Sequence, residues 1–294
     1  MTMPFHSPFR GALFSLASFA SYACTDVMVK FLGKEMNSLQ VMFLAAAFTL
    51  PFVLAQIAIT NRGGSLKPVL PLWAWARIVI TLINSALVTY TFTHLPIAQC
   101  YAILFTMPLM ITLLAWPLLG EPIDPVRGVI ILVGFAGVLI AVQPGSTTFH
   151  LAHLTAICGA TLGALNSLIL RKIGGLERAG VILVYPVMAQ VAGAALIMPF
   201  VWTPLQPHDW LAGTILGFLG TCGGLFIIAA YRRAPAIVVA PMQYSQILWA
   251  STISFYLFGE KPGLVTVLGI AVIITAGLAL LATAHRSRAQ ESLA

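Results

Sequence analysis

The sequence predicts an all-α membrane protein with ten transmembrane helices, arranged as two inverted five-helix repeats. Composition is the first observation: of 294 residues, 60% are hydrophobic and 8% are charged, and the mean hydropathy is +0.97. A soluble domain carries about 25% charged residues, because it needs a polar surface over its core. The 15 basic and 8 acidic residues cannot supply that surface. This composition excludes a soluble enzyme, a secreted disulfide scaffold and a disordered chain.

Ten long apolar stretches are the second observation. A membrane-spanning helix needs about 20 mostly apolar residues. Dividing the chain at its charges and its Pro/Gly clusters predicts spans over 10–32, 38–59, 71–93, 96–117, 125–143, 151–172, 180–202, 209–231, 236–258 and 263–284. The connections are short, so we expect no extramembrane domain. We expect the first span to be retained and not cleaved as a signal, since its apolar pattern continues past Cys24 to Leu32.

An internal repeat is the third observation. Each half carries a proline, a Gly-Glu pair 24 residues later, and then a glycine-spaced helix. These landmarks are Pro96, Gly120-Glu121 and Gly137 in the first half, and Pro235, Gly259-Glu260 and Gly277 in the second. The offset is 139 residues for the first two landmarks and 140 for the third. We therefore expect two repeats over 1–145 and 146–294. Because each has five spans, the second must enter the membrane inverted, which is typical of transporters with a site near the midplane.

These landmarks resemble the drug/metabolite transporter superfamily, and specifically its ten-helix EamA-type members. Lys30 at the end of the first span, Arg77 at the start of the third and Pro108 within the fourth add to the resemblance, which covers nearly all of the chain. One departure is Ile247, which occupies the repeat position of Pro108. Within the family, the aromatic-rich central helices are most similar to YddG-type aromatic amino-acid exporters. The resemblance implies a bacterial inner-membrane protein without enzymatic activity.

The expected function is secondary export of small metabolites by alternating access around a midplane cavity. Amino acids with aromatic or apolar side chains suit this chain best, because aromatic and Met-containing walls offer stacking and adaptable contact. A zwitterion has no net charge, which fits a cavity almost free of fixed charge. An efflux pump for lipophilic cationic drugs is the alternative, although it calls for a central acidic residue. A third possibility is a non-transporting scaffold or membrane enzyme, which would leave the inverted repeat unexplained.

The expected partners are a small-molecule substrate and the lipid bilayer. The formal net charge of +7 forms no basic cluster that would favour nucleic acid. We expect no cofactor. The oligomeric state and the coupling ion stay open.

The predicted substrate-binding residues lie near the middle of the bilayer or on stripes of helical periodicity. Polar side chains there are costly if they face lipid, so we expect them to face protein or a cavity. They are Tyr22, Asn84, Tyr101, Phe105, Asn166, Gln243, Tyr244, Gln246 and Trp249. For the two glutamines, helix packing and substrate contact are equally open. Ser15 and Ser18 share a face with Tyr22, and small polar residues of this kind also pack membrane helices together.

Three further residues in the predicted spans have expected roles. Pro108 removes a backbone hydrogen bond and should kink the fourth span. Asp26 and Lys30 are one helical turn apart, so they can form an ion pair. Asp26 is also the one acidic residue well inside a predicted span, which leaves a role in proton coupling open beside the structural one.

No metal site is expected from the spacing of potential ligands. The six histidines lie in tails or near loops without a metal-spaced partner. The four cysteines lie in apolar runs, where they are interpreted as small buried hydrophobes. The Gly-Glu pairs lie at helix ends, where we expect them to cap or pair and not to bind ligand.

The distribution of basic residues predicts that both termini are cytoplasmic. On the N-terminal side lie Arg10, Arg62, Lys67, Arg77, Arg127, Arg171, Lys172, Arg178, Arg232, Arg233, Arg286 and Arg288, against Lys30, Lys34 and Lys261 on the other. Cytoplasmic loops carry the excess of Lys and Arg. Alkaline phosphatase fused to the C-terminus should therefore be inactive. An active phosphatase fusion, together with an inactive cytoplasmic reporter at the same position, would contradict this topology.

Overall fold

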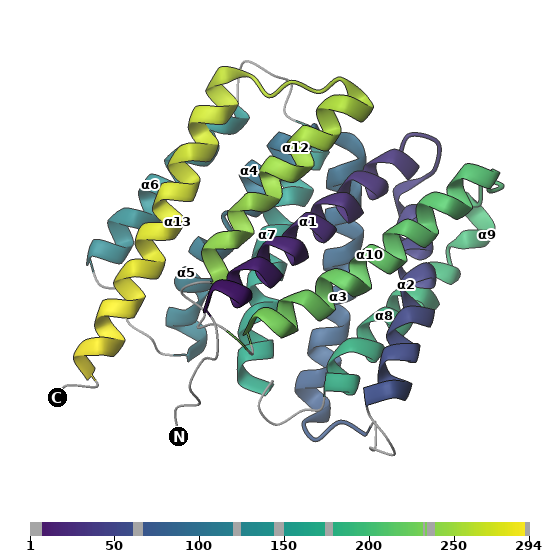
Figure 1. The fold of residues 1–294 in the computed structure, drawn as a ribbon, viewed down its shortest axis with the longest axis horizontal. Helices are drawn as coiled ribbons and strands as arrows, with labels where there is room; N and C mark the ends of the chain where they lie inside the picture. Colours follow the sequence, from purple (N-terminus) through teal and green to yellow (C-terminus); the bar gives the residue numbers. More distant parts are fainter. Residues whose placement is uncertain are drawn as a thin grey trace. The chain divides into compact units, whose positions relative to one another are not determined.

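The computed structural model describes residues 8–60, 67–119, 125–143, 150–173, 179–231, 233 and 239–291. Every regular element within these residues is a helix (Figure 1). Seven of the predicted spans are single helices: α1 Pro8–Leu32, α2 Ser38–Thr60, α3 Pro71–His94, α6 Pro125–Val142, α7 Leu151–Ile173, α10 Pro207–Tyr231 and α13 Leu264–Glu291. Three spans consist of two helices each: α4 Ile97–Leu104 with α5 Met107–Leu119, α8 Ala179–Ala195 with α9 Met198–Val201, and the 3-10 helix η1 Ala240–Tyr244 with α12 Ser245–Phe258.

Length and apolar composition agree with a multi-pass membrane protein. Six of the described helical stretches are long and apolar enough to cross a bilayer: Phe9–Leu32, Ser38–Ile59, Pro71–His94, Ile97–Leu114, Leu151–Ile169 and Pro207–Ile227. Shorter apolar helices cover Gly128–Val142, Val184–Ala195 and Leu264–Ala279. The predicted all-α membrane fold is thereby confirmed. Of the repeat landmarks, Gly120, Glu121 and Pro235 lie outside the described residues.

Two spans break where a proline collides with the preceding turn. Proline lacks an N–H, and its ring clashes with the carbonyl four residues earlier. α4 ends at Leu104, which is four residues before Pro108, and α8 ends at Ala195, four residues before Pro199. Pro108 therefore lies at the second position of α5, and the interruption falls at 105–106. The carbonyl of Ile103 accepts both the hydroxyl of Thr106 at 2.7 Å and its backbone N–H at 3.0 Å, so the chain keeps its hydrogen bonding at the break.

The chain forms two compact units, and each unit draws on both halves of the sequence. Unit 1 comprises 1–23, 96–150 and 223–294, and unit 2 comprises 24–95 and 151–222. Each compact unit therefore includes helices of both predicted repeats, and the repeat boundary near residue 145 stays a prediction.

In unit 1, α6 and α13 lie side by side along much of their length (Figure 1). Glycines permit this approach: a Cβ added to Gly137 would lie 3.0 Å from the carbonyl oxygen of Gly269. A Cβ on Gly269 would lie 2.6 Å from the Cβ of Ala141 and 2.6 Å from the carbonyl oxygen of Gly137. Small residues at helix interfaces are the usual means of association in lipid, where van der Waals contact replaces the hydrophobic effect.

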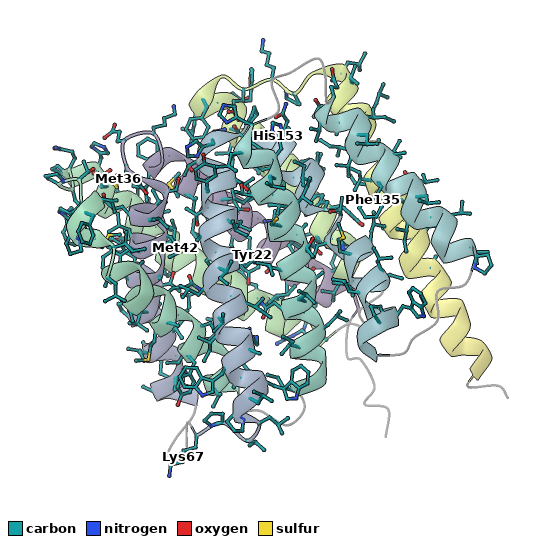
Figure 2. All side chains as sticks on the ribbon, turned by 180° about the vertical axis from the view of Figure 1, so that it is seen from behind. Tyr22, Met36, Met42, Lys67, Phe135 and His153 are labelled. Atoms are coloured by element: carbon teal, nitrogen blue, oxygen red, sulfur yellow. The ribbon has the colours of Figure 1, made fainter. Side chains whose placement is uncertain are left out.

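In unit 2, α3 packs on α7 and α2 packs on α8. Buried polar side chains secure the ends of these helices. The amide of Gln40 donates to the carbonyl of Thr203 at 2.7 Å and accepts from the N–H of the same residue at 2.8 Å. Lys67 lies at one end of this unit, and Met36 and His153 lie at the opposite end (Figure 2). Successive helix connections of this unit thus alternate between its two ends, as spanning helices require.

The α6–α13 contact predicts that Gly269→Ala destabilises the protein. The added methyl group must displace the backbone of α6, and overpacking of this kind costs about 1–3 kcal/mol. Gly128→Ala is the matched control on α6, because a Cβ there meets nothing within 4 Å. It should be neutral or stabilising by up to about 1 kcal/mol, the helix propensity that alanine gains over glycine. Unfolding in SDS measures both variants, and equal free energies of unfolding would contradict the packing argument.

Candidate functional site

Three of the predicted site residues form a continuous row of rings in unit 1. The ring centroids of Tyr101 and Phe105 are 5.2 Å apart, and those of Phe105 and Tyr244 are 5.4 Å apart with the rings nearly perpendicular. These separations lie in the favourable range for edge-to-face and tilted aromatic pairs. Tyr101, Phe105 and Tyr244 are 2%, 5% and 9% exposed. The structure thus brings together aromatic residues of the fourth and ninth spans.

Phe105 and Tyr244 occupy equivalent positions of the repeat, since they are 139 residues apart. Each lies where its span changes helical geometry: Phe105 follows the last residue of α4, and Tyr244 is the last residue of η1. Gly277 of α13 leaves the space that the Tyr244 phenol occupies, because a Cβ at Gly277 would overlap with the Tyr244 hydroxyl. The two halves of the sequence therefore meet through equivalent aromatic rings inside one unit.

The polar residues of the ninth span flank this row of rings along the chain. Gln243 and Gln246 are both half-buried. Trp249 is 45% exposed. An exposed indole on a spanning helix faces either lipid or an open cavity, so the role of Trp249 stays a prediction.

In α1, the two serines and Tyr22 make different contacts. The hydroxyl of Ser15 donates to the carbonyl of Val239 at 3.1 Å, and that of Ser18 donates to the carbonyl of Gly223 at 2.7 Å. Both serines are buried and therefore act in helix packing. Tyr22 is half-buried and lies against Gly223, where an added Cβ would come within 2.8 Å of the ring.

Unit 2 holds the two predicted asparagines, on the contacting helices α3 and α7. The side-chain oxygen of Asn166 accepts from the hydroxyl of Thr81 at 3.4 Å, which is a long hydrogen bond. Among the described residues, the buried Oδ1 atom of Asn84 has no hydrogen-bond partner. A buried acceptor without a donor is costly, and a donor from a bound molecule would remove that cost.

Lys30 has a structural contact at the end of α1. It is 8% exposed, and its ammonium donates to the carbonyl of Leu95 at 2.7 Å, just beyond the end of α3. Asp26 is half-buried one turn earlier. The contact to Leu95 gives Lys30 a role in joining α1 to α3, and the coupling role of Asp26 stays a hypothesis.

A cavity in unit 2 was not predicted from the sequence. It has a volume of about 440 Å³, and Asn37, Ser38, Tyr90 and His94 are among the residues that line it. The rings of Tyr90 and His94 are stacked, with centroids 3.9 Å apart. This volume lies in the range of small-molecule sites, about 300–1,000 Å³. The i, i+4 spacing of Tyr90 and His94 was visible in the sequence, but the walls that complete the cavity come from α7 and the α1–α2 connection.

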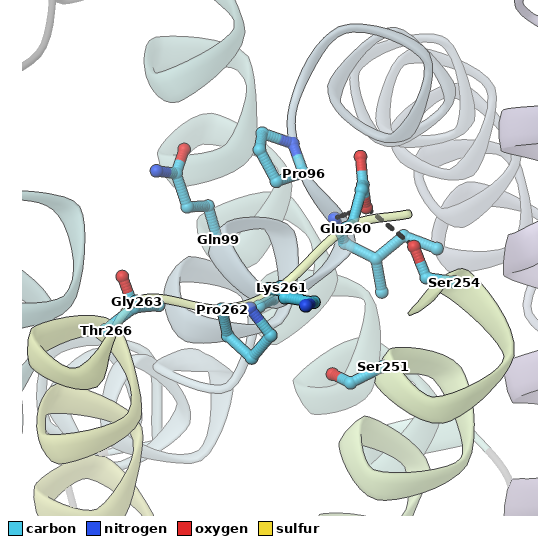
Figure 3. A pocket seen from close by; sticks show the side chains of 11 residues that line it. Pro96, Gln99, Ser251, Ser254, Glu260, Lys261, Pro262, Gly263 and Thr266 are labelled. Atoms are coloured by element: carbon cyan, nitrogen blue, oxygen red, sulfur yellow. Dashed lines mark hydrogen bonds between the residues drawn. The ribbon is translucent and has the colours of Figure 1, made fainter. Parts of the chain in front are cut away.

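The Gly-Glu pair at the end of α12 caps helices, as expected. Gly259 ends α12 with a φ of +70°, a left-handed conformation that glycine adopts without strain. Glu260 then accepts the backbone N–H of Ile97 at 3.2 Å and the hydroxyl of Ser254 at 2.6 Å (Figure 3). The carboxylate thereby satisfies a free N–H in the first turn of α4. A small cavity of about 90 Å³ lies beside it, between Gln99, Ser251 and Thr266.

The fold and these sites define a polytopic membrane protein built from two similar halves, and comparison with known proteins gives its family. The model of the EamA-like transporter family matches residues 9–143 and again 150–283. The chain therefore belongs to the EamA-like transporter family. Its members are transporters, which sets the enzyme alternative aside.

Two curated relatives illustrate the similarity over almost the whole chain. The S-adenosylmethionine uptake transporter of Rickettsia felis is 26% identical over 287 residues, which is 94% of this chain and 95% of that protein. The riboflavin transporter of Vibrio cholerae is 24% identical over 273 residues, or 92% of each chain. A solved crystal structure superposes with a TM-score of 0.66 at 18% identity, covering 92% of this chain and 98% of that one, which supports the fold.

The names of these relatives agree with the transporter family, but they do not support the narrower likeness expected within it. The relatives above are named for S-adenosylmethionine and riboflavin, so the likeness to YddG-type aromatic amino-acid exporters is not supported by them. The S-adenosylmethionine relative is named an uptake transporter, whereas export was expected from the sequence.

The Glu260 cap predicts a loss of stability in Glu260→Ala. The substitution leaves the N–H of Ile97 and the hydroxyl of Ser254 without this acceptor, which costs about 1–3 kcal/mol for a buried group. Glu260→Gln keeps an acceptor oxygen and should lose less. Thr252→Ala serves as control, because Thr252 is exposed on α12, the helix that contains Ser254. Unfolding in SDS measures the free energies of unfolding of these variants. A Glu260→Ala variant as stable as the control would refute the capping role.

Proposed function

We propose that this chain is a secondary transporter for small metabolites that carry a planar aromatic ring and a polar or zwitterionic group. Alternating access around a midplane cavity moves the substrate. The observation that carries the substrate class is the row of rings at Tyr101, Phe105 and Tyr244, at the points where the fourth and ninth spans change helical geometry. Interrupted spans in corresponding positions of two inverted repeats are the usual location of a transporter site.

Two further features support a ring-bearing substrate with hydrogen-bonding groups. The stacked Tyr90 and His94 offer a second aromatic surface beside a cavity of about 440 Å³. The Oδ1 atom of Asn84 offers an acceptor that lacks a donor among the described residues. A substrate amine can supply that donor, and stacking adds about 0.5–1.5 kcal/mol beyond the burial of area.

Adenosyl compounds of the S-adenosylmethionine type are the first substrate candidates, because they combine a purine ring with an amino-acid group and because the relative from Rickettsia felis carries that name. Amino acids with aromatic side chains are the second, since they share the ring and the zwitterion. Transport follows the substrate gradient, so uptake or export depends on which side holds more substrate. The sulfonium of S-adenosylmethionine adds one positive charge, so charge alone does not separate it from a lipophilic cation. Lipophilic cations suit the chain less well because they lack the amino-acid group that polar side chains can bind.

Counterflow into liposomes containing the purified protein tests this function. Labelled S-adenosylmethionine should exchange, and unlabelled S-adenosylmethionine, riboflavin and tryptophan are compared as competitors with a quaternary ammonium compound. Competition by ring-bearing metabolites supports the proposal. Competition by the quaternary cation alone would favour an efflux pump for lipophilic cations instead. Absence of exchange for every compound would refute the proposed transport function.

The predicted binding wall should respond to substitution within the same assay. It comprises Tyr22, Asn84, Tyr101, Phe105, Asn166, Gln243, Tyr244, Gln246 and Trp249. Gln246→Ala should weaken substrate binding by about 1–2 kcal/mol, because a buried partner loses its hydrogen bond. Trp249→Ala should impair aromatic substrates more than small ones. Leu268→Ala, at a 54% exposed position of α13, is the control. Unchanged exchange in both variants would refute this site even if the transport function holds.

A further inference from the structure

A group of three potential metal ligands lies in unit 2, outside the sites described above. Glu35 belongs to the connection between α1 and α2, and His208 and Asp209 belong to the first turn of α10. The Nε2 atom of His208 lies 3.3 Å from Oε2 of Glu35 and 3.3 Å from Oδ1 of Asp209. One ligand atom from each residue lies within 4.8 Å of the other two. The chain thus brings an imidazole and two carboxylates together across 173 residues of sequence.

The two nitrogen–oxygen separations match the edges of a tetrahedral metal site, and the two carboxylate oxygens lie within 4.8 Å of each other. Zn²⁺ binds His nitrogen and carboxylate oxygen at about 2.0–2.2 Å, and tetrahedral geometry then places neighbouring ligand atoms about 3.3–3.5 Å apart. Both nitrogen–oxygen separations of 3.3 Å meet that requirement. The set of one nitrogen and two oxygens favours a borderline transition metal over Mg²⁺ or Ca²⁺, which prefer oxygen ligands alone.

Asp209 is the buried member of this group of side chains. Asp209 is 2% exposed, and its Oδ2 atom accepts the backbone N–H of Gln206 at 2.7 Å. Its Oδ1 atom faces Nε2 of His208, which can hold a single hydrogen, and Glu35 competes for that hydrogen. A buried carboxylate oxygen therefore shares one donor with a second carboxylate. A divalent cation placed between the three atoms satisfies both carboxylates at once.

Access and electrostatics also suit a bound ion. The side chains of His208 and Glu35 are 47% and 58% exposed, so an ion reaches the group from solvent. The edge-on ring of Phe31, with its centroid 6.1 Å from that of His208, restricts the orientation of the imidazole. Two carboxylates contribute two negative charges, which outweigh the positive end of the α10 dipole, about half a charge.

We propose that Glu35, His208 and Asp209 form a binding site for a divalent transition metal, with Zn²⁺ as the probe. The three residues supply three ligands, and water completes the fourth position. Bound metal joins the α1–α2 connection to the start of α10. The proposal does not depend on the substrate, because it concerns binding at a separate place in the fold.

Titration of the full-length protein, purified without a histidine tag, tests the site. Calorimetry should show saturable binding of one Zn²⁺ per chain, and Zn²⁺ should raise the melting temperature of the wild-type protein. Glu35→Gln and His208→Gln should each weaken binding by at least about tenfold, since the loss of even an outer-shell partner costs about 10–100-fold. Excess Mg²⁺ should not displace the bound Zn²⁺.

The control is His94→Gln, which removes an exposed histidine of the same unit that stacks on Tyr90. It should bind Zn²⁺ as the wild type does. Asp209 is left intact in these variants because it also caps α10 through Gln206. Absence of saturable binding to the wild type, or equal affinity in Glu35→Gln, His208→Gln and His94→Gln, would overturn the proposal. Neither readout uses transport, so failure here leaves the proposed function untouched.

Discussion

Every backbone polar group of a spanning segment needs a partner inside the protein, because lipid offers none. This requirement explains why helix interruptions in the chain come with dedicated acceptors and donors. The break after Leu104 is accompanied by the hydroxyl of Thr106, which donates to the carbonyl of Ile103. The free N–H of Ile97 at the start of α4 is satisfied by the carboxylate of Glu260. The fourth span can thus be short, broken and aromatic without exposing its backbone to lipid.

Close helix approach is the second feature that shapes unit 1. Gly137 and Gly269 bring α6 and α13 together, and Gly277 leaves room for the phenol of Tyr244. Tyr244 of the row of rings therefore lies against one helix of a pair whose backbones approach closely at these glycines. Close packing of this kind fixes the orientation of aromatic rings.

The polar groups of unit 2 divide into satisfied and unsatisfied sets. Gln40 exchanges two hydrogen bonds with the backbone of Thr203, and Lys30 donates to the carbonyl of Leu95, so both serve the fold. The Oδ1 atom of Asn84 lacks a donor among the described residues, although it lies on a helix packed closely against α7. Satisfied polar groups stabilise a membrane fold, whereas a buried group that lacks a partner costs stability.

The sequence by itself determined the class of fold, because lipid is a uniform solvent that selects for apolar helices of set length. It also predicted the Gly259-Glu260 cap, which depends on local chemistry. It predicted a kink at Pro108, but it could not tell that the span breaks there while Pro51 and Pro186 lie inside continuous helices. That outcome depends on which neighbours satisfy the freed carbonyls. Only the tertiary structure brought Glu35 to His208 and Phe105 to Tyr244, since contacts between distant segments follow from packing and not from spacing along the chain.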